Sequence, residues 1–252
     1  MLFRSKEYQP SVGQEGKDVI WVPTPNELIA KMLDMAKLTP QDIHFDLGSG
    51  DGRTVIAAAK RGANATGVEF NPDMVALSNR SAQREGVASK VKFINADIFK
   101  TDFSNATVIT LYLLPSLNLK LRPIILGMKP GTRVVSHAFT MGEWEADETA
   151  NVEGRTAYFW VVPAKVEGNW RIEGGGAGDL SLKQEFQKVS GSAGGKAITS
   201  ASLRGDVISF SVDGREYSGR VSGDRMEGTV KGASRSEEHT SELQSHSFIS
   251  YA

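Results

Sequence analysis

A glycine-rich turn at residues 46–53, with the sequence DLGSGDGR, limits the possible folds more than any other segment. A strand-like run at 43–45 precedes it, and a helix-like run at 54–61 follows and stops at Gly62, a residue suited to a helix C-cap. Glycines at a strand-to-helix turn let the backbone approach a ligand closely, and the first helical turn offers free N–H groups. The pattern predicts a nucleotide-type site, and four residues of the turn are its expected contacts: Gly48, Ser49, Gly50 and Gly52.

Two acids beside this turn bear on the kind of nucleotide that it holds. Dinucleotide sites use the spacing G-x-G-x-x-G and place a pyrophosphate at the helix N-terminus. Here the glycines recur at every second position, and Asp46 and Asp51 flank them, where carboxylates would repel phosphate. These acids suit a ligand that has a positive centre and no phosphate. S-adenosylmethionine has both properties, and the following segments test that interpretation.

A second acid ends the next strand-like run, at residues 65–70. Glu69 lies at about the distance from the turn where a doubly wound fold places the carboxylate that binds ribose hydroxyls. A carboxylate accepts two hydroxyl protons at once, so the residue type fits a vicinal diol. Phe70 and Asn71 follow directly and are counted with the cofactor-binding residues.

A third acid follows the strand-like run at 91–94. Asp97 is expected to accept a hydrogen bond from an adenine amino group, with Ile98 and Phe99 flanking the ring. An ordinary loop acid is the alternative for Asp97 taken alone. Its position as the third acid after consecutive strands favours a ligand contact.

Two candidate catalytic residues come from apolar strands. Tyr112 lies in the run 108–113, which reads as a central parallel strand, and His137 ends the run 133–137. Both are candidate catalytic residues. The alternatives are a core tyrosine with a satisfied hydroxyl and a structural histidine bonded to backbone.

Thr24 belongs to a segment, residues 21–24, that precedes a helix-like pattern. Thr24 can cap that helix, with Pro25 in the first turn and Glu27 supporting the cap. Residues 21–24 either lead into a helix that covers the sheet or close one wall of the ligand pocket. Thr24 is counted with the cofactor-binding residues on the second interpretation.

The order of these runs predicts the fold class. Residues 19–164 alternate strand and helix five times and finish with two strands, which predicts an α/β fold with a Rossmann-like seven-stranded sheet and helices on both faces. Ligands of such sheets bind at the carboxyl ends of the strands. From residue 165 onward, glycine, serine and alternating apolar residues predict a small C-terminal antiparallel β module with tight turns.

Both ends of the chain look foreign to the fold. Residues 235–252 resemble a translated DNA-sequencing adapter, and residues 1–5 resemble its complement, so both are excluded from fold reasoning. The expected domains are an α/β ligand-binding unit with an N-terminal arm at 6–164 and the β module at 165–234. On this interpretation the β module lacks its last strand.

Composition excludes several classes of function. The net charge of −1, with charges mixed along the chain, gives no electrostatic case for a nucleic acid or a membrane surface. The chain has no cysteine, which excludes disulfides and thiolate metal sites, and no His/Asp/Glu cluster has metal-ligand spacing. We therefore expect no metal, no nucleic acid and no membrane contact, and a cytoplasmic location where the cofactor is supplied.

Taken in order, the turn with Asp46, then Glu69 and then Asp97 resembles class I S-adenosylmethionine-dependent methyltransferases. That resemblance implies that Asp46 and Gly48 hold the methionine portion, Glu69 the ribose and Asp97 the adenine.

A narrower resemblance rests on four segments, 22–25, 46–53, 113–115 and 130–136. They are similar to bacterial relatives of the lysine methyltransferases that act on the ATP synthase c-subunit and the adenine nucleotide translocase. It implies S-adenosylmethionine-dependent methylation of protein lysine. A small-molecule methyltransferase and a non-catalytic cofactor-binding or interaction protein are the alternatives.

Overall fold

The structure, a computed structural model, describes residues 8–15, 20–173, 178–232 and 246–251, and for 246–251 it describes the backbone. The expectation for residues 1–5, and most of that for 235–252, lies outside the described residues. The chain divides into two compact units. One takes in the chain up to Met128 together with Thr132–Trp160, and the other takes in Lys129–Gly131 and the chain from Val161 onward.

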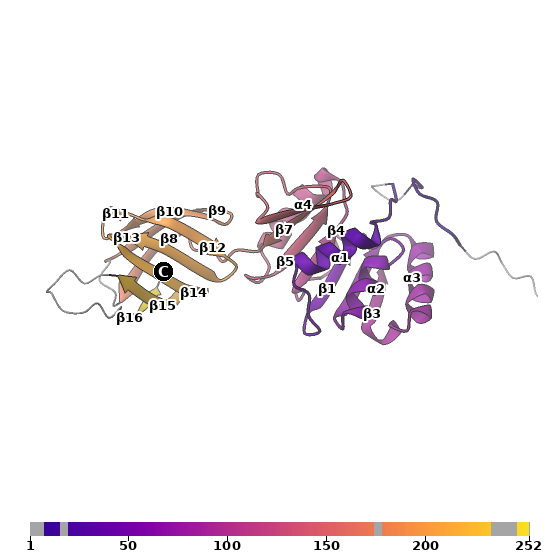
Figure 1. Ribbon diagram of the computed structural model, residues 1–252, viewed down its shortest axis with the longest axis horizontal. Coiled ribbons are helices and arrows are strands. Elements are labelled where there is room, and N and C mark those ends of the chain that lie inside the picture. Colours follow the sequence, from indigo (N-terminus) through magenta and orange to yellow (C-terminus); the bar gives the residue numbers. More distant parts are fainter. Residues whose placement is uncertain (1–7, 16–19, 174–177, 233–245, 252) are drawn as a thin grey trace, which may run out of the picture. The chain divides into compact units, whose positions relative to one another are not determined.

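The first unit contains a seven-stranded sheet in the order β3-β2-β1-β4-β5-β7-β6, as counted over the described residues (Figure 1). Its first five strands run parallel, and the β6–β7 hairpin closes it in antiparallel pairing. The strands are β1 (Ile43–Leu47), β2 (Asn64–Glu69), β3 (Val91–Asn95), β4 (Val108–Leu111), β5 (Arg133–His137), β6 (Glu148–Val152) and β7 (Arg155–Val161). The predicted Rossmann-like seven-stranded sheet is confirmed.

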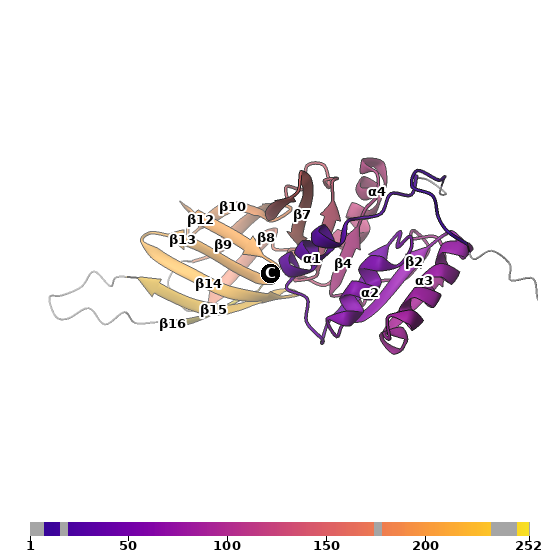
Figure 2. The same cartoon turned by 45° about the vertical axis from the view of Figure 1, so that its right-hand side comes forward.

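Four helices of the described residues pack with this sheet. They are α1 (Asn26–Met35), α2 (Arg53–Lys60), α3 (Pro72–Arg84) and α4 (Pro115–Leu126), with a short 3-10 turn η1 (Ala88–Lys90) before β3. In Figure 2, α2 and α3 lie side by side along β2. Their right-handed crossovers run toward β3, whereas α4 crosses in the opposite direction toward β5, which places it on the other face.

The beginning of α1 differs from the sequence prediction in one respect. Pro25 occupies the N-cap position, and no side chain caps the helix. The hydroxyl of Thr24, which we expected to cap it, instead lies 3.1 Å from Nδ1 of His137. Thr24 lies one residue before the N-cap and is buried, so its side chain belongs to the interior of the unit.

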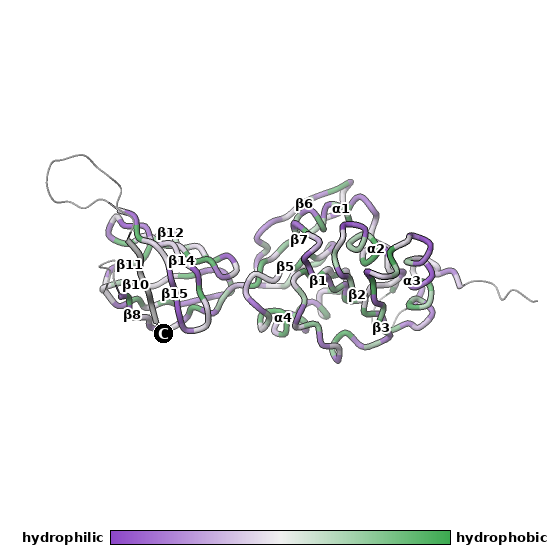
Figure 3. Tube along the Cα trace, turned by 90° about the horizontal axis from the view of Figure 1, so that it is seen from below, coloured by the Kyte–Doolittle hydropathy of each residue, from purple (hydrophilic) through white to green (hydrophobic). Residues whose placement is uncertain are grey.

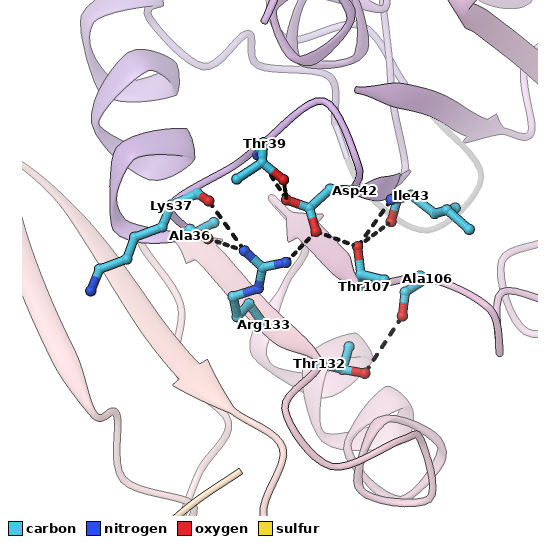
Figure 4. A network of polar contacts seen from close by, with 9 residues as sticks. All are labelled: Ala36, Lys37, Thr39, Asp42, Ile43, Ala106, Thr107, Thr132 and Arg133. Carbon is cyan, nitrogen blue, oxygen red and sulfur yellow. Dashed lines mark hydrogen bonds and ion pairs between the residues drawn. The ribbon is translucent and has the colours of Figure 1, made fainter. Parts of the chain in front are cut away.

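A polar network ties the base of the sheet together, at the end opposite the glycine turn (Figure 4). The carboxylate of Asp42 accepts hydrogen bonds from Thr39 and Thr107 and forms an ion pair with Arg133, the first residue of β5. The same guanidinium donates to the carbonyl of Ala36, where α1 ends, at 2.7 Å. Burial alone would raise the pKa of Asp42, but these hydrogen bonds and the Arg133 charge outweigh it and hold the pKa below its usual value.

The second unit is an antiparallel sheet in the order β11-β10-β9-β8-β16-β15-β14-β13-β12, again over the described residues. Its strands are β8 (Gly168–Glu173), β9 (Leu180–Glu185), β10 (Lys188–Ala193), β11 (Lys196–Ala197), β12 (Thr199–Arg204), β13 (Val207–Val212), β14 (Arg215–Ser222), β15 (Arg225–Gly232) and β16 (His246–Tyr251). Alternate residues face its core, and Phe210 stacks on Tyr217 of the next strand at 5.0 Å between ring centroids. Figure 3 shows this as alternating hydrophobic and hydrophilic colours along the strands.

We expected the β module to end at residue 234, whereas a further paired strand, β16, lies beyond that residue. The backbone of β16 pairs with β15 on one side and with β8 on the other, so the position where we expected a missing strand is filled. A strand edge offers unpaired N–H and C=O groups to any extended segment, and this accounts for the pairing. The adapter origin of residues 235–252 stays a prediction.

Candidate active site

A cavity of about 820 Å³ opens at the carboxyl ends of the parallel strands in the first unit. Its volume falls within the range of sites that bury a drug-sized ligand, roughly 300–1,000 Å³. The ends of β1, β2, β3 and β4 all contribute to it, as the doubly wound topology predicts. The N-terminal segment 20–24 contributes too, so the interpretation of residues 21–24 as a pocket wall agrees with the structure.

The glycine turn forms the floor of this cavity. The N–H groups of Gly48 and Ser49 both donate to the carbonyl of Val68, which fastens the turn to β2. Gly50 has a left-handed φ of +53°, and a Cβ atom built on it would lie 2.6 Å from Nε1 of Trp21. The indole of Trp21 therefore lies directly on the turn, and a side chain at Gly50 has no room.

Glu69 holds the turn in place while it faces the cavity. Its Oε2 accepts from the N–H of Gly50 and its Oε1 accepts from the N–H of Asn71, each at 2.9 Å. A carboxylate has about four acceptor positions. The two backbone bonds therefore fix its orientation and leave capacity for the two hydroxyls of a ribose.

Asp46 is a buried acid in the cavity wall with a polar chain behind it. The Thr110 hydroxyl donates to Oδ1 of Asp46 at 2.7 Å. That hydroxyl has one proton, so it accepts from Nε2 of His44, 2.8 Å away. Burial raises the pKa of Asp46 to about 7, against the bond from Thr110, and the charges of Asp51 and Glu69 raise it further. Burial also lowers the pKa of His44 to about 3, so its ring is neutral.

Two residues that the sequence predicts to bind adenine line the same cavity. Asp97 and Ile98 line it, and so do Phe70 and Asn71. Oδ1 of Asp97 accepts from the N–H of Phe99 at 2.9 Å, which fixes the carboxylate in a turn. The Asn71 side chain also caps α3, accepting from the N–H of Asp73 at 2.9 Å. The three acids expected from the sequence thus converge on one cleft.

The candidates for the acceptor side are also close together. The rings of Tyr112 and His137 lie 3.8 Å apart between centroids, and Thr24 bonds to His137 from the other side. Tyr112 and Thr24 line the cavity, whereas His137 is not among its lining residues and lies behind them. Burial, followed by the charge of Arg155, lowers the pKa of His137 to about 4, so this ring is neutral at physiological pH.

Two members of the predicted turn face elsewhere. Gly52 is not among the lining residues, and a Cβ atom on it would meet Ser78 and Phe93 instead. The Ser49 hydroxyl is buried near Gly67 and has no hydrogen-bond partner, so Ser49 contributes its backbone to the site.

The sequence analysis missed several lining residues. They include Gln14, Glu15 and Ile20 from the arm, Arg53 from α2, Leu117 from α4, and Phe139. The Phe139 position two residues beyond a strand end is the only signal in the sequence that could have found it.

The residues present fit S-adenosylmethionine. The cavity has a carboxylate for an ammonium at Asp46, an oriented carboxylate for a diol at Glu69 and an acceptor for an amino group at Asp97. The acids around the glycine turn disfavour a phosphate, and this ligand has none. No group of three or more His, Asp or Glu side chains in the described part of the chain could hold a metal ion. No helix in that part is long and apolar enough to span a membrane.

Comparison with known proteins agrees with this site. The family model for the ANTKMT methyltransferase domain matches residues 46–148. A protein-lysine N-methyltransferase from Saccharolobus islandicus is 38% identical over 151 residues, covering 57% of this chain and 94% of the relative. The human lysine N-methyltransferase of the ATP synthase c-subunit is 34% identical over 128 residues, and the match spans 54% of that protein and 50% of this chain.

A solved structure of similar fold also matches this chain. It is described as an RNA methyltransferase from Salinibacter ruber in complex with S-adenosyl-L-homocysteine, and it is 48% identical with a TM-score of 0.56. The match covers 57% of this chain and 96% of that one. With the match to nearly the whole archaeal relative and the cleft described above, the chain belongs to the ANTKMT methyltransferase family and is an S-adenosylmethionine-dependent methyltransferase.

Proposed function

We propose that this protein methylates the ε-amino groups of lysine residues in a protein substrate. The observation that carries the proposal is the 38% identity to an archaeal protein-lysine N-methyltransferase across 94% of that protein. The exposed Phe70 and Leu114 at the cavity support it, because an apolar rim open to solvent suits a macromolecular acceptor. The cytoplasm, where S-adenosylmethionine is supplied, is the proposed location.

The residues of this chain act mainly by positioning and by excluding water. S-adenosylmethionine, when bound, supplies a methyl group on a positively charged sulfur. Asp46, Glu69 and Asp97 orient it at the ends of β1, β2 and β3. The acceptor amine must be neutral to act as a nucleophile, and an apolar wall favours the neutral form by desolvation. Leu113, Leu114 and the ring of Tyr112 supply such a wall.

A nucleic-acid acceptor is the competing possibility, since the similar Salinibacter structure is described as an RNA methyltransferase. The charges oppose it. Five acids line the cavity, from Glu15 in the arm to Asp97 after β3, and the chain has a net charge of −1. Arg53 is the single Lys or Arg among the lining residues that the structure describes, so the cavity offers an RNA backbone few of the cationic contacts to phosphate on which nucleic-acid binding largely depends.

Labelling a cell lysate with tritiated S-adenosylmethionine and the full chain tests the proposal. The label should be removed by protease and should survive nuclease, and acid hydrolysis should release methyllysine. A Glu69→Ala variant is the matched control and should give no label. Label that appears only in RNA or in a small-molecule fraction would refute lysine methylation. Cofactor binding with no labelled product would favour a non-catalytic role.

A further inference from the structure

The cavity has two chemically different halves. The ends of β1, β2 and β3 and the glycine turn supply four of the five acids, and Glu15 comes from the arm, whereas the residues from β4, α4 and the loop after β5 are uncharged. In the described structure this second half consists of Leu111, Tyr112, Leu113, Leu114, Leu117 and Phe139. If the acids bind the adenosyl ligand across β3, β2 and β1, the uncharged half is left for the methyl acceptor.

Three rings in this half form what we call the aromatic wall: Tyr112, His137 and Phe139. Tyr112 lies 3.8 Å from His137 and 6.2 Å from Phe139 between ring centroids, at interplanar angles of 32° and 23°. Tyr112 and Phe139 line the cavity, and buried His137 supports Tyr112 from behind. Because His137 is neutral, the wall adds no positive charge to the acceptor side.

The backbone that carries the wall is strained and anchored on both sides. The N–H of Phe139 donates to the carbonyl of His137 at 2.8 Å, and Ala138 between them has a φ of +64°, which is the geometry of a rare γ-turn. The N–H of Ala138 donates to the carbonyl of Thr156 in β7 at 2.8 Å.

The second anchor of this turn is on α4. The side-chain NH₂ of Asn118, which is fully buried, lies 3.3 Å from the carbonyl of Phe139 and 3.2 Å from that of Thr140. Strained backbone that its surroundings hold this firmly occurs preferentially at functional sites.

We propose that the aromatic wall receives the methylammonium cation that each methyl transfer creates, and that Phe139 is an acceptor-site residue of this enzyme. The proposal rests on the proposed lysine methylation. In that reaction the amine lone pair forms the new N–C bond while the C–S bond breaks and its electron pair stays on sulfur. Positive charge therefore passes from sulfur to nitrogen, and the product later loses an N–H proton to water.

Aromatic faces suit this change better than carboxylates do. A ring face attracts a cation through its quadrupole and needs no N–H donor, so it binds an ammonium that carries methyl groups. A carboxylate at the same place would also stabilise the protonated lysine, which cannot react. Rings beside the nitrogen stabilise the charge that develops during transfer and hold the protonated lysine less strongly than a carboxylate would.

Two small probes separate cation binding from simple apolar contact. The cationic probe is Nα-acetyl-Nε-trimethyllysine methylamide, and the neutral probe carries a tert-butyl group in place of its trimethylammonium. Both are titrated by calorimetry into the full chain saturated with S-adenosylhomocysteine. We expect the cationic probe to bind about fivefold or more tightly than the neutral one, from a cation–π contribution of about 1 kcal/mol or above.

Two substitutions of Phe139 test whether its ring causes the preference for the cationic probe. Phe139→Leu keeps an apolar side chain and removes the ring, so the preference for the cation should fall to about twofold or less. Phe139→Tyr keeps the ring and should keep the preference, and both variants should bind S-adenosylhomocysteine as the parent does. Equal binding of the two probes, no binding of the cationic probe, or an unchanged preference in Phe139→Leu would overturn the proposal.

The lysate experiment distinguishes this result from failure of the proposed function. Methyllysine in the hydrolysate together with equal binding of the two probes would leave lysine methylation standing and remove the role of the wall. Label confined to RNA would overturn both, because the rings would then stack on a nucleobase.

Discussion

Protonation of Asp46 should control cofactor affinity near neutral pH. Its carboxyl is buried against the cavity and its pKa is raised to about 7, so in the ligand-free protein it is largely neutral in mild acid. A ligand ammonium is bound by the ionised carboxylate. Ligand binding should therefore release a proton from Asp46 below about pH 7, and affinity should fall as the pH falls.

The size of the effect follows from this pKa. With a midpoint at about 7, the ionised fraction falls roughly 25-fold between about pH 7.5 and about pH 5.5. The two buried histidines do not interfere, because the pKa of His44 is lowered to about 3 and that of His137 to about 4. The dissociation constant of S-adenosylhomocysteine should rise by a similar factor over this range, as measured by calorimetry.

Two variants make the test specific. Asp46→Asn cannot titrate, so its weaker binding should be nearly independent of pH. Thr110→Val removes the 2.7 Å hydrogen bond that favours the ionised carboxylate, and it should move the midpoint up by about one pH unit. A parent profile as flat as that of Asp46→Asn would refute the assignment of Asp46 to the ammonium.

The raised pKa of Asp46 also affects the stability of the ligand-free protein, which should fall as the pH rises, whereas ligand affinity should increase. The folded state holds the Asp46 proton more tightly than the unfolded chain does. This contribution to stability is complete below about pH 4 and is lost as the pH rises through about 7, and it amounts to roughly 4 kcal/mol. Bound ligand should reverse the trend, so the rise in melting temperature on ligand binding should be larger at about pH 7.5 than at about pH 5.5.

Three further outcomes follow from single contacts. Glu69→Ala removes the acceptor for a ribose diol and should weaken S-adenosylhomocysteine binding about 100-fold in calorimetry. Gly50→Ala places a Cβ atom against the indole over the turn and should weaken that binding, whereas Gly86→Ala, also at positive φ but in open space, should leave it unchanged. Arg133→Met leaves the charge of Asp42 without its cation and should cost about 2–3 kcal/mol in urea unfolding; an unchanged midpoint would contradict this.

The cofactor half of the site could be predicted from sequence because its chemistry is local. Asp46 and Glu69 lie at the carboxyl ends of recognisable strands and Asp97 follows one, and carboxylates at such ends are unusual in a hydrophobic sheet. Sheet topology then brings them together without further information. The same logic found the glycine turn, although Gly52 packs against Ser78 of α3 and Phe93 of β3 and does not face the cavity.

The predicted helix cap at Thr24 is wrong because a threonine hydroxyl can either cap a helix or bond to a residue distant in the sequence. Thr24 before a proline reads as a helix cap, but the nearby ring of His137 competes for its hydroxyl, and this tertiary contact cannot be seen in the local sequence. The expected boundary at residue 234 is a different case and stays a prediction. Whether a strand edge is filled depends on backbone hydrogen bonding, which β16 provides whatever its sequence resembles.

The acceptor half is hard to predict because it is built from the residue types that also form cores. Phe139 in a sequence looks like any buried aromatic residue, and its exposure to the cavity depends on the turn at Ala138. Alanine gives no sign of the positive φ that the structure imposes there, because glycine or asparagine is the usual residue at such a position. Hydrogen bonds hold that turn from two sides, one donated by Ala138 to the Thr156 carbonyl and one donated by the Asn118 side chain to the Phe139 carbonyl, and neither partner is near the turn in sequence. Sequence therefore predicts which cofactor the enzyme uses more readily than which acceptor it methylates, because the acceptor wall depends on long-range contacts.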